Sequence, residues 1–156
     1  MEQAQLVREY KENGKLEIQL PGEKVLKLVN PTNWTQEMGS DWIFLLHELF
    51  QIRTICKPFS EISLDIVEFA SKPTIYHSPV NSLLDNAPVE SGLIKFALIR
   101  EPNWNKLLFQ IGRPVLAKLI EGVTTGSQVQ IPFPLQIKEV KELYLGTEGE
   151  VKIYKA

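Results

Sequence analysis

Apolar and polar positions alternate near the start of the chain, with a period of two residues. Leu16, Ile18 and Leu20 are separated by polar residues, which is typical of a strand with one buried face. The turn residues Pro21 and Gly22 follow, and the apolar residues of 25–29 predict a second strand. The preceding residues 2–12 are rich in polar side chains and indicate a polar helix or an arm. The N-terminal part is therefore expected to form a helix and a strand pair.

Helical spacing of apolar residues appears in three later segments. The run from Trp42 to Leu46 continues at Leu49 and Ile52, which predicts a helix that Asp41 would cap. A second helix is expected over residues 60–70 and a third over residues 103–110. A Gly-Arg-Pro sequence ends the third one.

The remaining segments read as strands. Residues 93–99 are nearly all apolar, as in a central strand that is buried on both faces. Other strands are predicted over 72–76 and 115–120, an extended edge over 129–133, and a terminal hairpin of 140–145 with 151–154. Strands that alternate with helices predict an α/β fold, a twisted mixed sheet with flanking helices, in a single domain over residues 1–156.

Composition and charge exclude several classes of protein. The 156 residues are 44% hydrophobic, which argues against disorder, and their net charge of −2 argues against a dedicated binder of duplex DNA. One cysteine and two histidines cannot form the usual zinc sites, so no metal and no other cofactor is predicted. No apolar segment approaches the roughly 18 residues of a membrane span, and the charged start does not look like a signal peptide. The expected location is the cytoplasm, without membrane association.

Several short segments occur in an order that resembles the YrdC/Sua5 family, the threonylcarbamoyl-AMP synthases of tRNA modification. Residues 71–76 (SKPTIY) are similar to the family's PGPLTLIL strand, and residues 92–100 (GLIKFALIR) to its GxxxxRIP strand. Residues 104–116 resemble LLxxxGxPLxxTSAN, and residues 149–153 resemble the closing EVKILR strand. Residues 21–26 lie where KRPxxKPL would fall. The resemblance implies a YrdC/Sua5-like fold.

The chain departs from this family at the positions that carry its chemistry. Gln19 and Leu20 stand where the family has the Lys-Arg pair before proline, which neutralises phosphate charge. Residues 117–121 (AKLIE) lack the family's Ser and Asn, and no counterpart of PTDTxYGL precedes Pro21, so the N-terminal part is short. No catalytic residue of the family can be assigned. The resemblance therefore implies a YrdC-like core that has lost the synthase reaction.

Four cations flank the segments that resemble the family. Lys95, Arg100, Arg113 and Lys118 would form a groove for a nucleotide or RNA if they converged on one face. Alternatively, Arg113 stabilises the C-terminus of the helix that precedes it.

Three other side chains have both a functional and a structural interpretation. His47 is a candidate ligand or catalytic group, but a histidine among apolar residues more often belongs to the core. His77 lies near a strand end, where sites often form, or is a plain turn residue. Cys56 lies near Arg53 and Lys57, which would favour a reactive thiolate, although a packing role is more common.

Three functional hypotheses remain open. The preferred one is a divergent, non-catalytic or altered protein that binds a nucleotide or RNA. The second is an active threonylcarbamoyl-AMP synthase-like enzyme that uses other residues. The third is a small interaction module that pairs with a protein partner or a second copy through an edge strand or residues 131–134.

Overall fold

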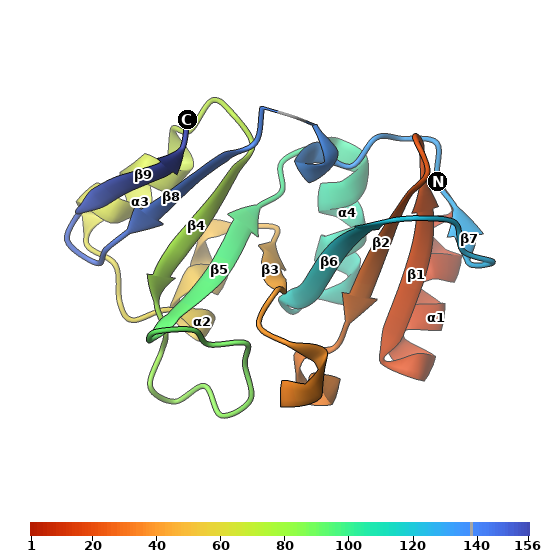
Figure 1. Cartoon of the computed structure of the whole chain (residues 1–156), viewed down its shortest axis with the longest axis horizontal. Coiled ribbons are helices and arrows are strands. Elements are labelled where there is room, and N and C mark those ends of the chain that lie inside the picture. Colours follow the sequence, from red (N-terminus) through yellow and green to blue (C-terminus); the bar gives the residue numbers. More distant parts are fainter. Residues whose placement is uncertain (138) are drawn as a thin grey trace.

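A nine-stranded mixed sheet forms the centre of the computed structural model, which describes residues 1–137 and 139–156. The strands lie in the order β7-β1-β2-β6-β3-β5-β4-β8-β9 (Figure 1). Their bounds are β1 Lys15–Leu20, β2 Lys24–Val29, β3 Ile43–Leu46, β4 Thr74–Pro79, β5 Leu93–Leu98, β6 Val115–Glu121, β7 Ser127–Gln128, β8 Lys141–Leu145 and β9 Val151–Lys155. The helices are α1 Gln3–Asn13, α2 Ile52–Ile55, α3 Glu61–Glu68 and α4 Pro102–Ile111. The predicted α/β class with a mixed sheet is confirmed.

Parallel and antiparallel pairs alternate irregularly across the sheet. The pairs β1–β7, β3–β5 and β4–β8 are parallel, and the other pairs are antiparallel. The β3–β5 pair lies in the middle of the sheet, where Phe44 is the register partner of Phe96. It is the parallel pair that positions the candidate site described below.

Two apolar cores lie on opposite faces of this sheet and meet at β3. Successive side chains of a strand point to opposite faces. Leu45 belongs to the core that α1 and α4 cover, which we call the α4 core. Its neighbours Phe44 and Leu46 belong to the core that α2 and α3 cover, the α3 core. Residues adjacent in sequence thus contribute to different cores.

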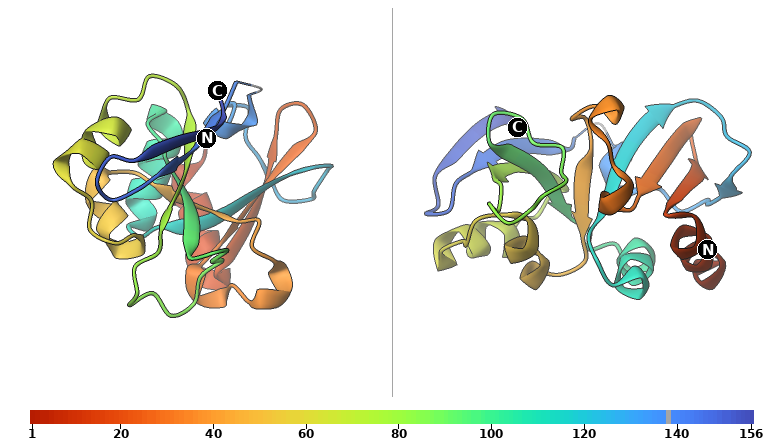
Figure 2. Two further views of the ribbon diagram at one scale, coloured as in Figure 1. Left: turned by 60° about the vertical axis from the view of Figure 1, so that its left-hand side comes forward. Right: turned by 90° about the horizontal axis from the view of Figure 1, so that it is seen from below.

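The twist of the sheet places all four helices on one side of the molecule. Neighbouring strands rotate by about 20–25° each, so a sheet this wide turns through roughly half a circle. The face covered by α4 at one end therefore points the same way as the face covered by α3 at the other end. The view from below in Figure 2 shows α1, α2, α3 and α4 together on one side of the strands.

The helix predicted from Asp41 through Ile52 is wrong. Residues Ile43–Leu46 form β3, and only the short α2 follows, after a 3₁₀ turn over Leu49–Gln51. Because β3 is buried on both faces, its sequence is a continuous apolar run without the alternation of a half-exposed strand. Such a run cannot be distinguished from a buried helix by its periodicity.

Two further boundaries differ from the predictions. The predicted edge over residues 129–133 is not a strand; the strand that pairs with β1 is β7, two residues earlier. Pro132 and Pro134 have no amide hydrogen for a ladder, which prevents further pairing there. The helix α4 begins at Pro102, one residue before the predicted start, and its cap is Glu101, whose carboxylate accepts a hydrogen bond from the Trp104 amide at 2.9 Å.

Other predicted elements are confirmed. Residues 93–98 form the central strand β5, residues 61–68 form α3, and β8 and β9 form the terminal antiparallel hairpin. The helix α4 ends at Ile111 because Gly112 adopts a φ of 86°, which is the left-handed conformation that glycine favours. In the described part of the chain no helix is long and apolar enough to cross a membrane.

Candidate functional site at the ends of β3 and β5

β3 and β5 are neighbouring parallel strands, but the segments that follow them lie on opposite faces of the sheet. After β3 the chain continues to α2 and α3 on one face, and after β5 it continues to α4 on the other face. In open α/β sheets, ligands usually bind outside the carboxyl ends of strands where the connections diverge in this way. A cavity of about 660 Å³ lies at this place, which we call the switch-point cavity.

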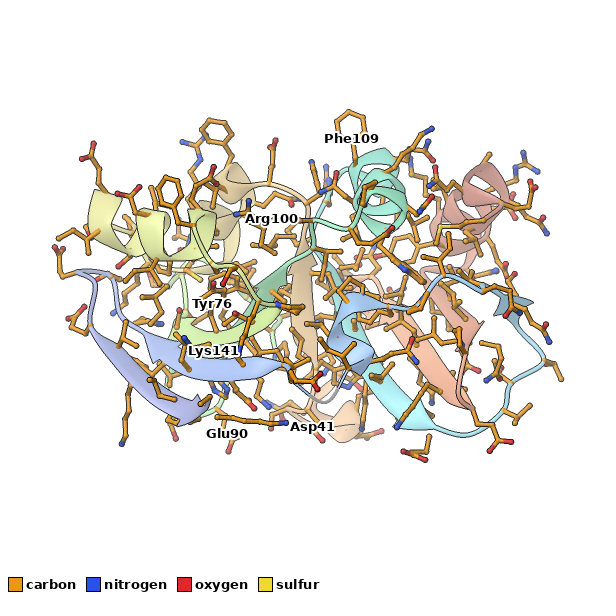
Figure 3. The ribbon with its side chains drawn as sticks, turned by 90° about the horizontal axis from the view of Figure 1, so that it is seen from above. Asp41, Tyr76, Glu90, Arg100, Phe109 and Lys141 are labelled. Atoms are coloured by element: carbon orange, nitrogen blue, oxygen red, sulfur yellow. The ribbon has the colours of Figure 1, made fainter. Side chains whose placement is uncertain are left out.

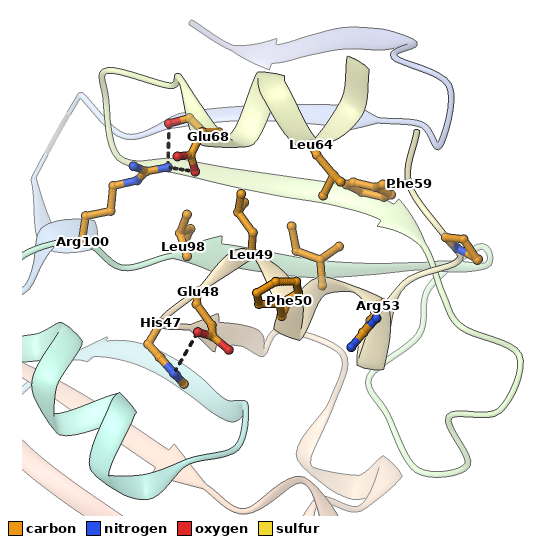
Figure 4. A pocket seen from close by; sticks show the side chains of 12 residues that line it. His47, Glu48, Leu49, Phe50, Arg53, Phe59, Leu64, Glu68, Leu98 and Arg100 are labelled. Carbon is orange, nitrogen blue, oxygen red and sulfur yellow. Dashed lines mark hydrogen bonds and ion pairs between the residues drawn. The ribbon is translucent and has the colours of Figure 1, made fainter. Parts of the chain in front are cut away.

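The floor of the switch-point cavity is apolar (Figure 4). Leu98 comes from β5 and Leu64 from α3, and both pack at the edge of the α3 core. The other apolar lining residues are Leu49, Ile52, Pro58 and Phe59. Phe50 stands at the cavity with 70% of its surface exposed. An exposed phenylalanine beside an apolar cavity offers a ring face to a ligand.

Two arginines on the rim have different roles. The Nη2 group of Arg100 donates hydrogen bonds to the carbonyl oxygens of Val67 at 3.1 Å and Glu68 at 2.7 Å. It also lies 3.5 Å from the Glu68 carboxylate (Figure 4). Arg100 therefore holds the C-terminal end of α3, where a cation is favoured. Figure 3 shows it between α3 and α4.

Arg53 is the rim cation that is free for a ligand. Its guanidinium carbon lies 5.6 Å from the centre of the Phe50 ring, in a cation–π contact. Within the described residues it makes no ion pair. Arg53 and Phe50 therefore present a charged and an aromatic group side by side.

His47 closes another side of the switch-point cavity. Its Nε2 lies 4.0 Å from a Glu48 carboxylate oxygen, and its ring is nearly perpendicular to that of Phe109 from α4, with 5.5 Å between the ring centres. The Nδ1 atom is buried without a hydrogen-bond partner among the described residues, as is Nε2 of Gln51. Unpaired buried polar atoms are unusual in folded proteins and often occur at functional sites.

The ends of β3 and β5 are joined by a residue that was not expected from the sequence. The side-chain Nδ2 group of Asn105 donates to the carbonyl oxygens of His47 at 2.9 Å and Ile99 at 2.8 Å. In addition, the Ile99 amide donates to the Leu46 carbonyl. An asparagine within an amphipathic helix looks like an ordinary solvent-facing residue, so the sequence contains no signal for this role.

The structure places the four predicted nucleotide- or RNA-binding cations apart. Lys95 on β5 forms an ion pair with Asp41 at 3.7 Å, and Arg100 caps α3 as described above. Arg113 lines a separate cavity of about 530 Å³, and Lys118 on β6 lines another. By strand alternation, Lys95 and Lys118 point to opposite faces of the sheet, so one groove does not hold all four. Their binding of nucleotide or RNA stays a prediction.

His77 and Cys56 also have defined surroundings. His77 lies within β4 rather than in a loop, and its Nε2 is 2.6 Å from the Glu142 carboxylate. Cys56 is fully buried, and this burial raises the pKa of its thiol, which favours the packing interpretation. No group of three or more potential metal ligands lies together in residues 1–137 and 139–156.

No protein-family model matches the chain, and no curated protein matches it. The fold and the site therefore define this molecule as an α/β domain with a ligand-sized cavity at the carboxyl ends of its central parallel strands.

Proposed function

We propose that the chain binds a nucleoside phosphate in the switch-point cavity, as a divergent relative of the YrdC/Sua5 family without the synthase motifs. The observation that supports this most is the apolar floor together with Arg53, which lies beside Phe50 and makes no ion pair within residues 1–137 and 139–156. The volume of about 660 Å³ lies within the range of small-molecule sites, roughly 300–1,000 Å³.

The base of the nucleotide would lie on the apolar part of the cavity. A nucleobase is flat, and stacking on an aromatic side chain contributes about 1–3 kcal/mol. The Phe50 ring is exposed and available for such a contact. The phosphate would then reach Arg53, whose planar guanidinium forms paired hydrogen bonds with phosphate oxygens.

The charge of the rim favours a ligand with few phosphates. Glu48 and Glu68 also line the cavity, and Glu68 is already opposite Arg100. Each carboxylate repels additional negative charge on the ligand. We therefore expect AMP to bind more tightly than ATP.

Thermal unfolding with AMP, ATP, adenosine and a tRNA mixture tests this proposal. A ligand that binds the native state alone stabilises it by RT ln(1+[L]/Kd), about 2.7 kcal/mol at one hundred times Kd. We expect a shift with AMP that grows with the logarithm of its concentration above Kd, and a smaller shift with ATP at equal concentration. The absence of any shift with AMP and ATP would refute the proposal.

Two pairs of variants locate the site. Phe50→Ala and Arg53→Gln should each weaken AMP binding about tenfold, as the loss of a stacked base or a charge-assisted hydrogen bond would. The matched controls are Phe69→Ala, also highly exposed but outside this cavity, and Arg8→Gln on α1. Equal effects of the control and the site variants would contradict binding in the switch-point cavity.

The other hypotheses make different predictions in the same experiment. Stabilisation by tRNA alone would favour RNA binding. The synthase-like alternative requires formation of threonylcarbamoyl-AMP from threonine, bicarbonate and ATP, which is a direct product assay.

An interaction module is the second candidate because β9 is exposed. Its five residues are all exposed, and it is the last strand of the sheet. The apolar Val151 and Ile153 lie on it, but so do Lys152 and Lys155. Lysines on an edge strand usually prevent pairing with another chain, so ligand binding remains the preferred function.

A further inference from the structure

A second cavity lies on the other side of α2 from the switch-point cavity. Ile52 and Arg53 line the switch-point cavity, while Thr54 and Ile55 line this one, so the short helix separates the two. The second cavity has a volume of about 530 Å³. Its lining also includes residues from the C-terminal ends of α1 and α4, among them Lys11 and Ile111.

The charge of this second cavity is positive. Lys11 and Arg113 line it, and none of the residues that line it is acidic. Neither cation forms an ion pair with any residue that the structure describes. In contrast, Lys24, Lys95 and Arg100 each have a carboxylate within 4 Å.

The negative C-terminal ends of α1 and α4 offset part of this positive charge but not all of it. Each helix C-terminus is equivalent to about half a negative charge, which the nearby cation offsets. Two helix ends therefore offset about one of the two positive charges. One carbonyl oxygen at each of these helix ends also has a hydrogen-bond donor. The Gly14 backbone amide donates to the Tyr10 carbonyl, and the Gly112 backbone amide donates to the Leu108 carbonyl. About one positive charge remains for a ligand.

A neutral hydrogen-bond donor is fixed at the same place. The Oδ1 atom of Asn30 accepts hydrogen bonds from the Thr32 amide at 3.0 Å and its hydroxyl at 2.9 Å. This leaves the Nδ2 group of Asn30, which makes no hydrogen bond within residues 1–137 and 139–156, as a further donor. Asn30, Lys11 and Arg113 thus supply amide, ammonium and guanidinium donors, the groups that bind phosphate oxygens.

We propose that the second cavity binds the phosphate group of a small phosphorylated molecule, independently of the switch-point cavity. Lys11 and Arg113 neutralise the phosphate, and the side-chain amide of Asn30 donates to one of the phosphate oxygens. The floor contributed by Phe44, Ile55 and Ile111 accommodates the uncharged part of the ligand.

An NMR titration of the ¹⁵N-labelled chain with inorganic phosphate and pyrophosphate tests this inference. We expect saturable shifts of the backbone amides of Asn30, Thr32 and Thr54. A parallel titration with chloride at equal ionic strength controls for screening. Shifts that do not saturate, or that appear equally with chloride, would overturn the proposal. Saturation by citrate without saturation by phosphate would overturn the choice of phosphate.

Substitutions of the two cations provide the second part of the test. Arg113→Gln and Lys11→Gln should each weaken pyrophosphate binding about tenfold, since a hydrogen bond to a charged group is lost. Both residues are exposed, so the variants should keep their fold, which circular dichroism checks. Arg113→Lys keeps the charge without the guanidinium fork and should give an intermediate loss.

The matched controls separate this site from the other one. Lys106→Gln and Lys152→Gln should leave pyrophosphate binding unchanged, because both residues are exposed and line neither cavity. If either control weakens binding as much as Arg113→Gln does, the interaction is non-specific charge attraction and the proposal fails. Binding of AMP that survives Arg113→Gln, with loss of pyrophosphate binding, shows that the two sites are distinct.

Discussion

At the scale of single residues, Asn105 has the largest consequence for the site. Its side-chain amide joins the ends of β3 and β5, which form one wall of the switch-point cavity. Asn105→Ala leaves two partly buried carbonyl groups without this donor. We expect the free energy of unfolding to fall by about 1–3 kcal/mol, measured by urea denaturation.

The neighbouring Asn103 is the control for this prediction. Its side-chain amide donates to the half-buried carboxylate of Glu101, and within the described residues it bonds to no group of a strand. Asn103→Ala should therefore change the stability by no more than about 0.5 kcal/mol, as expected for a surface position. If both variants lose the same free energy, Asn105 does not act as the joint between the strands.

Cys56 should be chemically inert in the folded protein. The thiolate is the reactive form, and burial of Cys56 raises its pKa, so little thiolate forms at neutral pH. We expect no reaction with a disulfide reagent such as DTNB at pH 8 under native conditions. In guanidinium chloride one thiol per chain should react. Rapid labelling of the native protein would contradict the packing role.

At the scale of elements, the start of α4 depends on Glu101. Its carboxylate accepts hydrogen bonds from the Trp104 amide and the Asn103 side chain. Partial burial raises the pKa of Glu101, but these hydrogen bonds outweigh it, and the net pKa is lowered from the ordinary value of 4.5. The stability that the carboxylate contributes is therefore fully present above about pH 4.5 and is lost as the pH falls through the lower folded-state pKa.

The variant Glu101→Ala tests this cap. At pH 7 it should lose about 0.5–2 kcal/mol, the usual value of an N-cap. The difference from the unmodified protein should shrink as the pH falls below the ordinary carboxyl value. Glu12→Ala, at an exposed position on α1, should show a small difference at every pH. A pH-independent loss for Glu101→Ala would show that the carboxylate charge is not involved.

The same scale shows what the sequence could and could not predict. Elements with one exposed face, such as β1 with Leu16, Ile18 and Leu20 on one side, were predictable from their alternation. β3 was not, because both of its faces are buried and its apolar run has no period. The switch-point cavity follows β3 directly, so the error at this strand also hid the site around His47 and Arg53.

At the scale of the whole molecule, two cores share one set of central strands. β3, β5 and β6 contribute alternate side chains to the α3 core and the α4 core. Loss of either core removes one buried face from these strands. We therefore infer that neither core is stable without the other, although they lie on opposite faces.

The three tryptophans allow this cooperativity to be measured. Trp104 lies in the α4 core, whereas Trp34 and Trp42 lie in the α3 core. The double variant Trp34→Phe with Trp42→Phe reports on the α4 core alone, and Trp104→Phe reports on the α3 core. In each variant the midpoint of urea unfolding followed by fluorescence should coincide with the midpoint followed by circular dichroism. A fluorescence transition that precedes the loss of secondary structure in one variant would show that its core unfolds independently, and that the shared strands do not couple the two halves.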